Sequence, residues 1–230
     1  MDLIGVFIIL IALPYIYADD NSNCRFLYTA LGDSLAAGVA AFGKQGYVYR
    51  YHNWLNINKY DRSLKLYNSG VLGLTSAGLM GNLYSNPRLQ EAIRKSSVVT
   101  LDIGANDIIK ARYNTEMLRR SADAFEVNFN NILQAIRTFN TQGQLYVMDI
   151  YNPYPQGAQL HDLTEEWVGK FNNTIYSACK NKSYNVNGVA AVYEAFKGNE
   201  FQYTLIGSGN RHPNSLGHAV IGQCFERITV

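Results

Sequence analysis

The sequence predicts a single α/β domain: a three-layer α/β/α sandwich around a five-stranded parallel sheet. Short and nearly continuous apolar runs alternate along the chain with longer segments whose apolar residues recur every three or four positions. Continuous apolar runs are typical of strands that helices cover on both faces, and their alternation with helices favours right-handed crossovers between parallel strands. No linker, low-complexity stretch or internal repeat interrupts residues 19–230, so we interpret them as one domain.

The predicted elements follow one another in regular order. Strands are expected at residues 26–31, 64–67, 98–103, 145–150 and, more weakly, 186–193. Helices are expected after residue 46, over 87–95, 118–136 and 167–179, and after residue 216. The clearest is 118–136, where Leu118, Phe125 and Phe129 belong to an apolar stripe of about five turns. Each predicted strand is therefore followed by a helix, as crossovers between parallel strands require.

The first 18 residues are expected to be a signal peptide. Residues 3–17 are almost wholly apolar, and Ala18 is followed by a polar run. An apolar segment of about 15 residues suits a signal peptide better than a bilayer span. A retained N-terminal anchor is the alternative, because no Lys or Arg precedes the segment. In both cases residues 19–230 are expected outside the cytoplasm, as a secreted or cell-envelope protein.

Composition and cysteine usage exclude several classes of function. The 20 basic and 18 acidic residues give a net charge of +2 without a long basic run, so no nucleic-acid partner is expected. The spacing of Cys24, Cys179 and Cys224 selects no disulfide pair, and no Cys/His cluster has the spacing of metal ligands. Neither a metal nor a cofactor is therefore expected.

Four polar, turn-forming clusters fall where the predicted strands end. They are residues 32–35, 68–70 and 104–107 and, near the C-terminus, 212–218. In parallel sheets ligands bind beyond the carboxyl ends of the strands, which share one edge. We therefore expect the four clusters to form one site.

The residue types in these clusters suit acyl transfer. Ser34 is the candidate nucleophile, and the imidazole of His212 is the candidate general base that takes its proton. The oxyanion of a tetrahedral intermediate needs preorganised donors. The backbone N–H groups of Ser34 and Gly70 and the side-chain amide of Asn106 are the candidates.

These motifs make the chain resemble the SGNH (GDSL-type) hydrolases, a family named for its Ser, Gly, Asn and His. The matching residues are Ser34, Gly70, Asn106 and His212, and the resemblance covers residues 25–228. The stretches 46–51, 151–155 and 195–198 are similar to bacterial lipases linked to spore germination. The resemblance implies a flavodoxin-like fold and metal-independent hydrolysis of carboxylic esters.

One position departs from the family pattern. The family usually places an Asp three residues before the catalytic His, whereas this chain has Gly209 there. Asn210 or a backbone carbonyl is the expected orienter of His212, and neither balances an imidazolium charge as a carboxylate does. The leading interpretation is a secreted esterase or lipase acting on a lipid or an acylated small molecule, in contact with a lipid or membrane surface. A carbohydrate O-acetyl esterase and a catalytically weakened binding protein are the alternatives.

Two neighbouring acids and a second histidine are expected to have structural roles. Asp33 and Asp107 follow the motif residues closely and are interpreted as acceptors that order their loops. His218 is interpreted as a packing residue near the start of the last helix rather than as a second base.

Overall fold

The computed structural model describes residues 25–229, and both the predicted signal peptide and Cys24 lie outside them. Five parallel strands form one sheet in the order β2-β1-β3-β4-β5, the flavodoxin-like order. Their bounds are β1 (Phe26–Gly32), β2 (Leu64–Gly70), β3 (Val98–Asp102), β4 (Gln144–Met148) and β5 (Gly188–Ala190). The predicted sandwich and its five-stranded sheet are confirmed.

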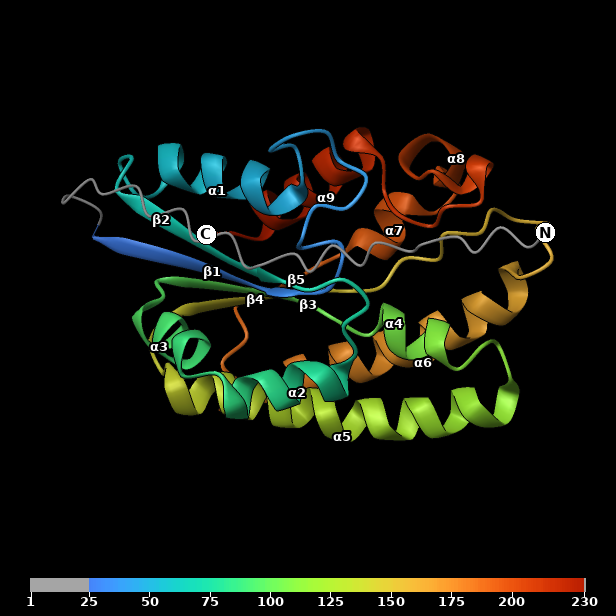
Figure 1. Cartoon of the computed structure of the whole chain (residues 1–230), viewed down its shortest axis with the longest axis horizontal. Helices are drawn as coiled ribbons and strands as arrows, with labels where there is room; N and C mark the ends of the chain where they lie inside the picture. Colours follow the sequence, from blue (N-terminus) through green and yellow to red (C-terminus); the bar gives the residue numbers. More distant parts are fainter. Residues whose placement is uncertain (1–24, 230) are drawn as a thin grey trace, which may run out of the picture.

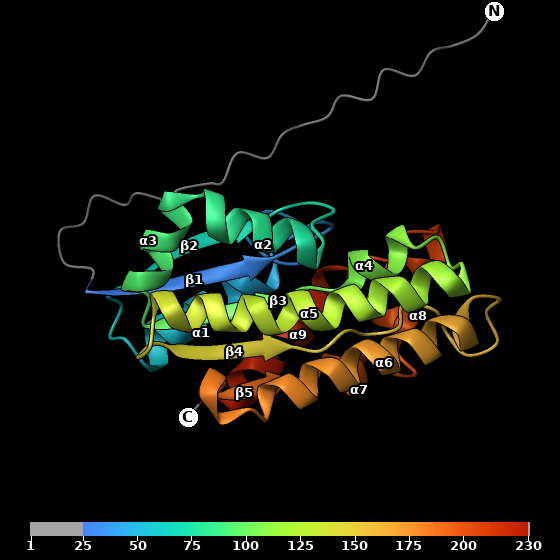
Figure 2. The same cartoon turned by 90° about the horizontal axis from the view of Figure 1, so that it is seen from below.

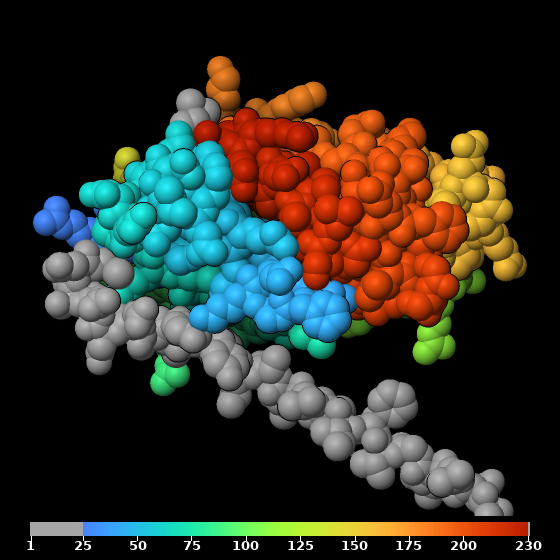
Figure 3. All heavy atoms as spheres, turned by 90° about the horizontal axis from the view of Figure 1, so that it is seen from above, coloured from blue at the N-terminus to red at the C-terminus, as the bar shows by residue number. Residues whose placement is uncertain are grey.

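Helices cover both faces of the sheet (Figure 1). One layer contains α1 (Tyr47–Asn58), α7 (Val192–Phe196), α8 (Glu200–Tyr203) and α9 (Ser215–Ile228). The other contains α2 (Ser76–Ser85), α3 (Pro87–Lys95), α4 (Ala105–Lys110), α5 (Thr115–Phe139) and α6 (His161–Cys179). Two short 3₁₀ turns, η1 (Lys182–Tyr184) and η2 (Ile206–Ser208), complete the chain. Figure 2, which views the molecule from below, shows α5 and α6 side by side in front of the sheet. Figure 3 shows the opposite face, where α1 and α9 lie side by side.

Each layer buries its own aromatic core. On the α5 side, the ring centroids of Phe125 and Phe171 are 4.6 Å apart. On the α1 side, the ring of Phe225 lies 5.4 Å from that of Tyr47 and 5.3 Å from that of Tyr51. Aromatic pairs at these distances stabilise the packing beyond the area that they bury. These two cores hold the crossover helices against the sheet and fix the strand ends that carry the polar clusters.

The structure differs from the predicted elements in two respects. The fifth strand is shorter than expected, because the Asp149 carboxylate accepts hydrogen bonds from the Val192 and Tyr193 amides, at 2.7 and 2.8 Å, and so starts α7 there. Four helices, α2, α4, α7 and α8, were not predicted. Of these, α2 contains Gly78 and Gly81, which disfavour helix, and the other three are too short to show a periodic stripe.

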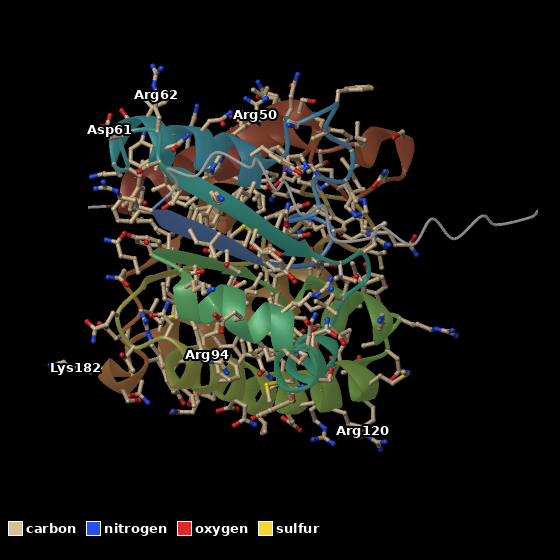
Figure 4. The ribbon with its side chains drawn as sticks, turned by 60° about the vertical axis from the view of Figure 1, so that its left-hand side comes forward. Arg50, Asp61, Arg62, Arg94, Arg120 and Lys182 are labelled. Carbon is tan, nitrogen blue, oxygen red and sulfur yellow. The ribbon has the colours of Figure 1, made fainter. Side chains whose placement is uncertain are left out.

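Strand register brings the polar clusters to one edge. Gly32, the last residue of β1, pairs with Gly70 of β2 on one side and with Asp102 of β3 on the other. Among the described residues, no helix is long and apolar enough to cross a membrane. Within residues 25–229, Cys179 and Cys224 form no disulfide. The labelled charged residues Arg62, Arg120 and Lys182 project from the periphery (Figure 4), whereas the motif residues gather at the sheet edge.

Candidate active site

The candidate nucleophile lies on a sharp turn at the end of β1. The amides of Ala37 and Val39 donate to the carbonyl oxygens of Asp33 and Ser34, at 3.1 and 3.0 Å, which closes the turn. Gly32 is required just before it, because a Cβ there would overlap the carboxylate of Asp102 on the neighbouring strand. The turn thus points the Ser34 hydroxyl toward the segment that carries His212.

Three side chains form a hydrogen-bonded chain at this turn. The Ser34 hydroxyl oxygen (Oγ) lies 2.9 Å from Nε2 of His212, and Nδ1 of His212 lies 2.7 Å from Oδ1 of Asn210. The same Oδ1 also accepts the backbone N–H of His212 at 3.0 Å. Because that N–H requires an acceptor, the amide oxygen of Asn210 faces the ring. Nδ1 therefore carries the proton, and the lone pair of Nε2 faces the serine.

The environment of His212 keeps its imidazole neutral. Partial burial, together with the positive charge of Arg211, lowers the pKa of His212 below its usual value. A neutral imidazole at neutral pH is the form that can accept the Ser34 proton.

The predicted oxyanion donors differ in whether their hydrogens already take part in other hydrogen bonds. The Ser34 amide donates no hydrogen bond among the described residues. One hydrogen of the Asn106 side-chain amide is donated to Asp33 at 2.8 Å, which leaves its second hydrogen for another acceptor. The third candidate, the Gly70 N–H, is not unobstructed in this structure, because it already donates to Oδ1 of Asn68 at 2.9 Å. Its role as an oxyanion donor stays a prediction.

Gly70 has a packing role at the same strand end. A Cβ at Gly70 would overlap the backbone of Ala37, so only glycine lets the nucleophile turn lie against β2. Asn68 holds the turn from the same side, because its Nδ2 donates to the carbonyl oxygen of Ala36 at 2.7 Å. This cluster therefore supports the position of Ser34.

A pocket of about 300 Å³ opens beside Ser34 and His212. Its apolar lining comes from the ends of β3 and β4 and from α4 and α6, with Ile103, Ile108, Ile109, Met148, Ile150 and Val168 among its members. Half-buried residues, Tyr113, Pro153 and Arg211, line its more exposed part. A mostly apolar cavity with a few convergent polar groups is the usual form of a small-molecule site.

Comparison with known proteins identifies the family. The sequence model of the GDSL-like lipase/acylhydrolase family matches residues 30–220. The chain belongs to this family. It is 26% identical over 207 residues to the spore germination lipase LipC of Bacillus licheniformis, which covers 85% of this chain and 92% of LipC. The membership makes the chain a carboxylic ester hydrolase.

Solved structures of a lipase and an esterase share the fold of this chain. The lipase Lip_vut3 from a goat rumen metagenome superposes with a TM-score of 0.76 at 25% identity, covering 88% of this chain and 97% of that one. A catalytic mutant of Axe2, an acetylxylan esterase from Geobacillus stearothermophilus, superposes with a TM-score of 0.68 at 15% identity, covering 89% of this chain and 94% of that one. The second likeness shows a shared fold.

The family's usual acid is replaced here by Gly209, and the structure explains how the loop is built. Gly209 has a φ of 78°, in the left-handed region that favours glycine, and its Cβ position meets nothing within 4 Å. Glycine thus ends the short turn η2 and directs the following Asn210 toward His212. Of the two orienters expected from the sequence, it is the Asn210 side chain that contacts the ring.

A buried acid beneath the nucleophile turn was missed in the sequence. Asp102 is 1% exposed and accepts hydrogen bonds from the Asp33 amide, at 2.9 Å, and from the Tyr47 hydroxyl. Burial, with the nearby charge of Asp33, raises the pKa of Asp102 well above its usual range. Burial also raises the pKa of Asp33, against hydrogen bonds from Leu35 and Asn106. Asp102 lies inside the apolar run at 98–103, and an acid within such a run was the signal available.

The other acid and histidine lie as expected. Asp107 accepts hydrogen bonds from the Ser76 amide and hydroxyl, at 2.9 and 2.6 Å, and so orders the start of α2. His218 is buried: its Nδ1 accepts the Tyr47 N–H at 3.2 Å, and its Nε2 lies 2.9 Å from the carbonyl oxygen of Val39. Among the described residues, no three His, Cys, Asp or Glu side chains are grouped as metal ligands.

Proposed function

We propose that this hydrolase cleaves acyl esters through an acyl-enzyme on Ser34. His212 takes the hydroxyl proton as Ser34 Oγ attacks the ester carbonyl, and the oxyanion is received by the Ser34 N–H and the second Asn106 hydrogen. The imidazolium then gives its proton to the departing alcohol oxygen, which leaves the acyl group on Ser34. Water, deprotonated by the same imidazole, attacks this acyl-enzyme and releases the carboxylic acid and Ser34.

The observation that carries this proposal is the hydrogen-bonded chain from Ser34 through His212 to Asn210. Its two contacts, 2.9 and 2.7 Å, have the lengths that proton transfer and tautomer control need. The contact between Asn210 and His212 also favours an active enzyme over the weakened binding protein, because a neutral acceptor already selects the reactive tautomer.

The lining of the pocket favours a fatty or medium-length acyl group over acetyl. Its interior is formed by aliphatic side chains, including Ile108, Ile150 and Val168, which gain little from an acetyl group and more from each added methylene. LipC and Lip_vut3 are named as lipases, which supports the same assignment. The alternative of a carbohydrate O-acetyl esterase is supported by the shared fold with Axe2 alone.

Contact with a lipid surface and export are parts of the same proposal. Phe42 is 83% exposed and Leu216 48%, and both line a shallow hollow formed by residues 40–42, 202, 205 and 214–216. Phe201, which is 69% exposed, directly precedes one of these residues in the chain. Figure 3 shows the segment around residue 42, in light blue, beside the red C-terminal part. Exposed apolar side chains around a hollow are typical of surfaces that meet lipid or protein. The apolar segment at 3–17 supports export.

The experiment is ester hydrolysis across acyl lengths, comparing the native protein with Ser34→Ala and with Ser85→Ala. Ser85 is an exposed serine of α2 and is the matched control. We expect Ser34→Ala to reduce kcat by at least about 10³-fold with the fold unchanged, while Ser85→Ala behaves as native. We also expect butyrate and longer esters to exceed acetate. Half of the native rate in Ser34→Ala would refute the acyl-enzyme, and a preference for acetate would favour the O-acetyl esterase.

A further inference from the structure

The active-site pocket holds one cation whose partner is not a carboxylate. Arg211 is the one Arg or Lys among the described residues that line the pocket. Salt bridges pair other exposed cations of the described chain, such as Arg94 and Arg119, with Asp or Glu, but none of them includes Arg211. A guanidinium carries five N–H donors, so Arg211 has donors to spare for a ligand.

Two tyrosine hydroxyls hold this guanidinium in place. Nη1 of Arg211 lies 3.3 Å from the hydroxyl oxygen of Tyr113 and 3.3 Å from that of Tyr154, and the two hydroxyl oxygens are 3.1 Å apart. The contacts occupy Nη1 alone among the side-chain nitrogens. Tyr151 fixes the backbone of the same residue, because its hydroxyl donates to the Arg211 carbonyl oxygen at 2.8 Å.

The backbone that presents Tyr113 is strained. Arg112 and Tyr113 have φ values of 52° and 55°, so two consecutive residues with side chains adopt the left-handed conformation. Each such residue costs of the order of 1 kcal/mol, and strain of this kind concentrates at ligand sites. The strain places a phenol hydroxyl beside Arg211 at the pocket.

The position of Arg211 in the chain indicates which part of the ester it meets. It directly precedes His212, whose Nε2 must pass a proton to the departing alcohol oxygen. With the acyl chain in the aliphatic interior, as proposed above, the alcohol part leaves past the segment 209–212, which also lines the pocket. The other charged groups of the lining, Asp33 and Asp102, have their carboxylate oxygens occupied by N–H or O–H donors. An incoming anion therefore meets the free donors of Arg211.

We propose that Arg211, with the hydroxyls of Tyr113 and Tyr154, binds an oxyanion on the alcohol part of the ester. This subsite rests on the proposed acyl-enzyme mechanism and narrows its substrates to acyl esters of anionic alcohols. Guanidinium groups bind planar and tetrahedral oxyanions through paired N–H donors. Because the two phenols hydrogen-bond each other, one hydroxyl hydrogen remains to supply a further donor.

The test compares two esters that differ in one charge. They are para-(hexanoyloxy)benzenesulfonate and para-(hexanoyloxy)benzenesulfonamide, and the readout is the ratio of their kcat/KM values. We expect the native enzyme to favour the sulfonate by at least about tenfold, the effect of one charge-assisted hydrogen bond. Arg211→Gln should bring the ratio close to one, Arg211→Lys should retain part of it, and Tyr113→Phe should lower it about threefold. Lys182→Gln, which removes a remote surface charge, should keep the native ratio.

Three results would overturn the subsite. The first is a native ratio near one, the second a ratio that Arg211→Gln leaves unchanged. The third is a preference for charge on the acyl side instead, measured with the para-nitrophenyl half-ester of octanedioic acid against para-nitrophenyl octanoate. Failure of the proposed mechanism looks different: Ser34→Ala would then hydrolyse both benzenesulfonyl esters at the native rate. Tyr113→Phe keeps the test valid if Arg211→Gln does not fold.

Discussion

Replacing the neutral orienter of the histidine by an acid, Asn210→Asp, is expected to make the enzyme faster and to shift its activity to higher pH. The substitution changes one side-chain atom and keeps an oxygen both at 2.7 Å from Nδ1 of His212 and at 3.0 Å from its backbone N–H. At present burial and Arg211 lower the pKa of His212, and no carboxylate opposes them.

The magnitude follows from the geometry. A carboxylate in direct hydrogen-bond contact raises the pKa of a half-buried histidine by about 1–2 units, and the positive charge of Arg211 keeps the shift in the lower part of the usual range. That shift corresponds to about 1.4–2.7 kcal/mol of stabilisation of the imidazolium. If about half of it is present in the transition state, kcat on the alkaline plateau rises about 3- to 10-fold.

At acid pH the Asn210→Asp substitution should slow the enzyme, whereas on the alkaline plateau it should speed it up. His212 must be neutral to accept the Ser34 proton, so a higher pKa leaves less of the base form at low pH. The acid limb of kcat/KM should therefore move upward by about 1–2 pH units, and the variant should be slower than the native enzyme near pH 5. The assay is kcat/KM for a neutral ester between about pH 5 and pH 9, with folding checked by circular dichroism.

Two variants serve as controls for this effect. Asn210→Ala removes the acceptor and should lower kcat by about 10- to 100-fold, because the Nδ1 proton loses its partner. Gly209→Asp restores the family's acid on a backbone with a φ of 78°, so it should lose about 1 kcal/mol of stability and gain less activity than Asn210→Asp. A folded Asn210→Asp enzyme with the native plateau and the native acid limb would refute the role given to Asn210.

Three further predictions test the surroundings of Ser34. Asn106→Ala should lower kcat by about 10²–10³-fold with KM nearly unchanged, because its donor acts on the charge that develops on oxygen; a loss confined to KM would contradict this. Gly32→Ala should unfold at markedly lower urea concentration, because its Cβ would overlap the Asp102 carboxylate; a native midpoint would show that the strands can move apart. The raised pKa of Asp102 means that its contribution to stability is fully present below the unfolded pKa of about 4 and is lost as pH rises through the folded value. Between pH 5 and pH 9, the free energy of unfolding should therefore fall by at least about 1 kcal/mol less in Asp102→Asn than in the native protein. An equal fall in both proteins would contradict this prediction.

The elements that depend on local sequence could be predicted, and so could the convergence of the motifs. Periodicity alone located the stripe of α5, because its apolar residues face one buried layer over many turns. The continuous apolar runs gave the parallel sheet, and a parallel sheet places Gly32, Gly70 and the end of β3 at one edge. The closeness of Ser34 and Asn106 follows from that topology.

The features that were missed depend on tertiary contacts. The hydrogen bond from the Gly70 amide depends on the side-chain conformation of Asn68, which cannot be predicted from the spacing of residues in the sequence. In the cluster around Arg211, Tyr113 and Tyr154 lie 98 and 57 positions before Arg211 in the chain, so no local motif could predict their contact. Tyr113 reaches that cluster through a left-handed backbone, which its sequence gives no reason to expect.

Covalent trapping at Ser34 is a direct test of the acyl-enzyme mechanism. The protein is treated with an alkyl organophosphonate ester carrying a good leaving group, and the modified peptide is located by mass spectrometry. We expect one adduct, on Ser34, that is absent from Ser34→Ala, forms much more slowly in His212→Ala and forms at the native rate in Ser85→Ala. An adduct on another residue, or labelling of Ser34 at the native rate without His212, would contradict it.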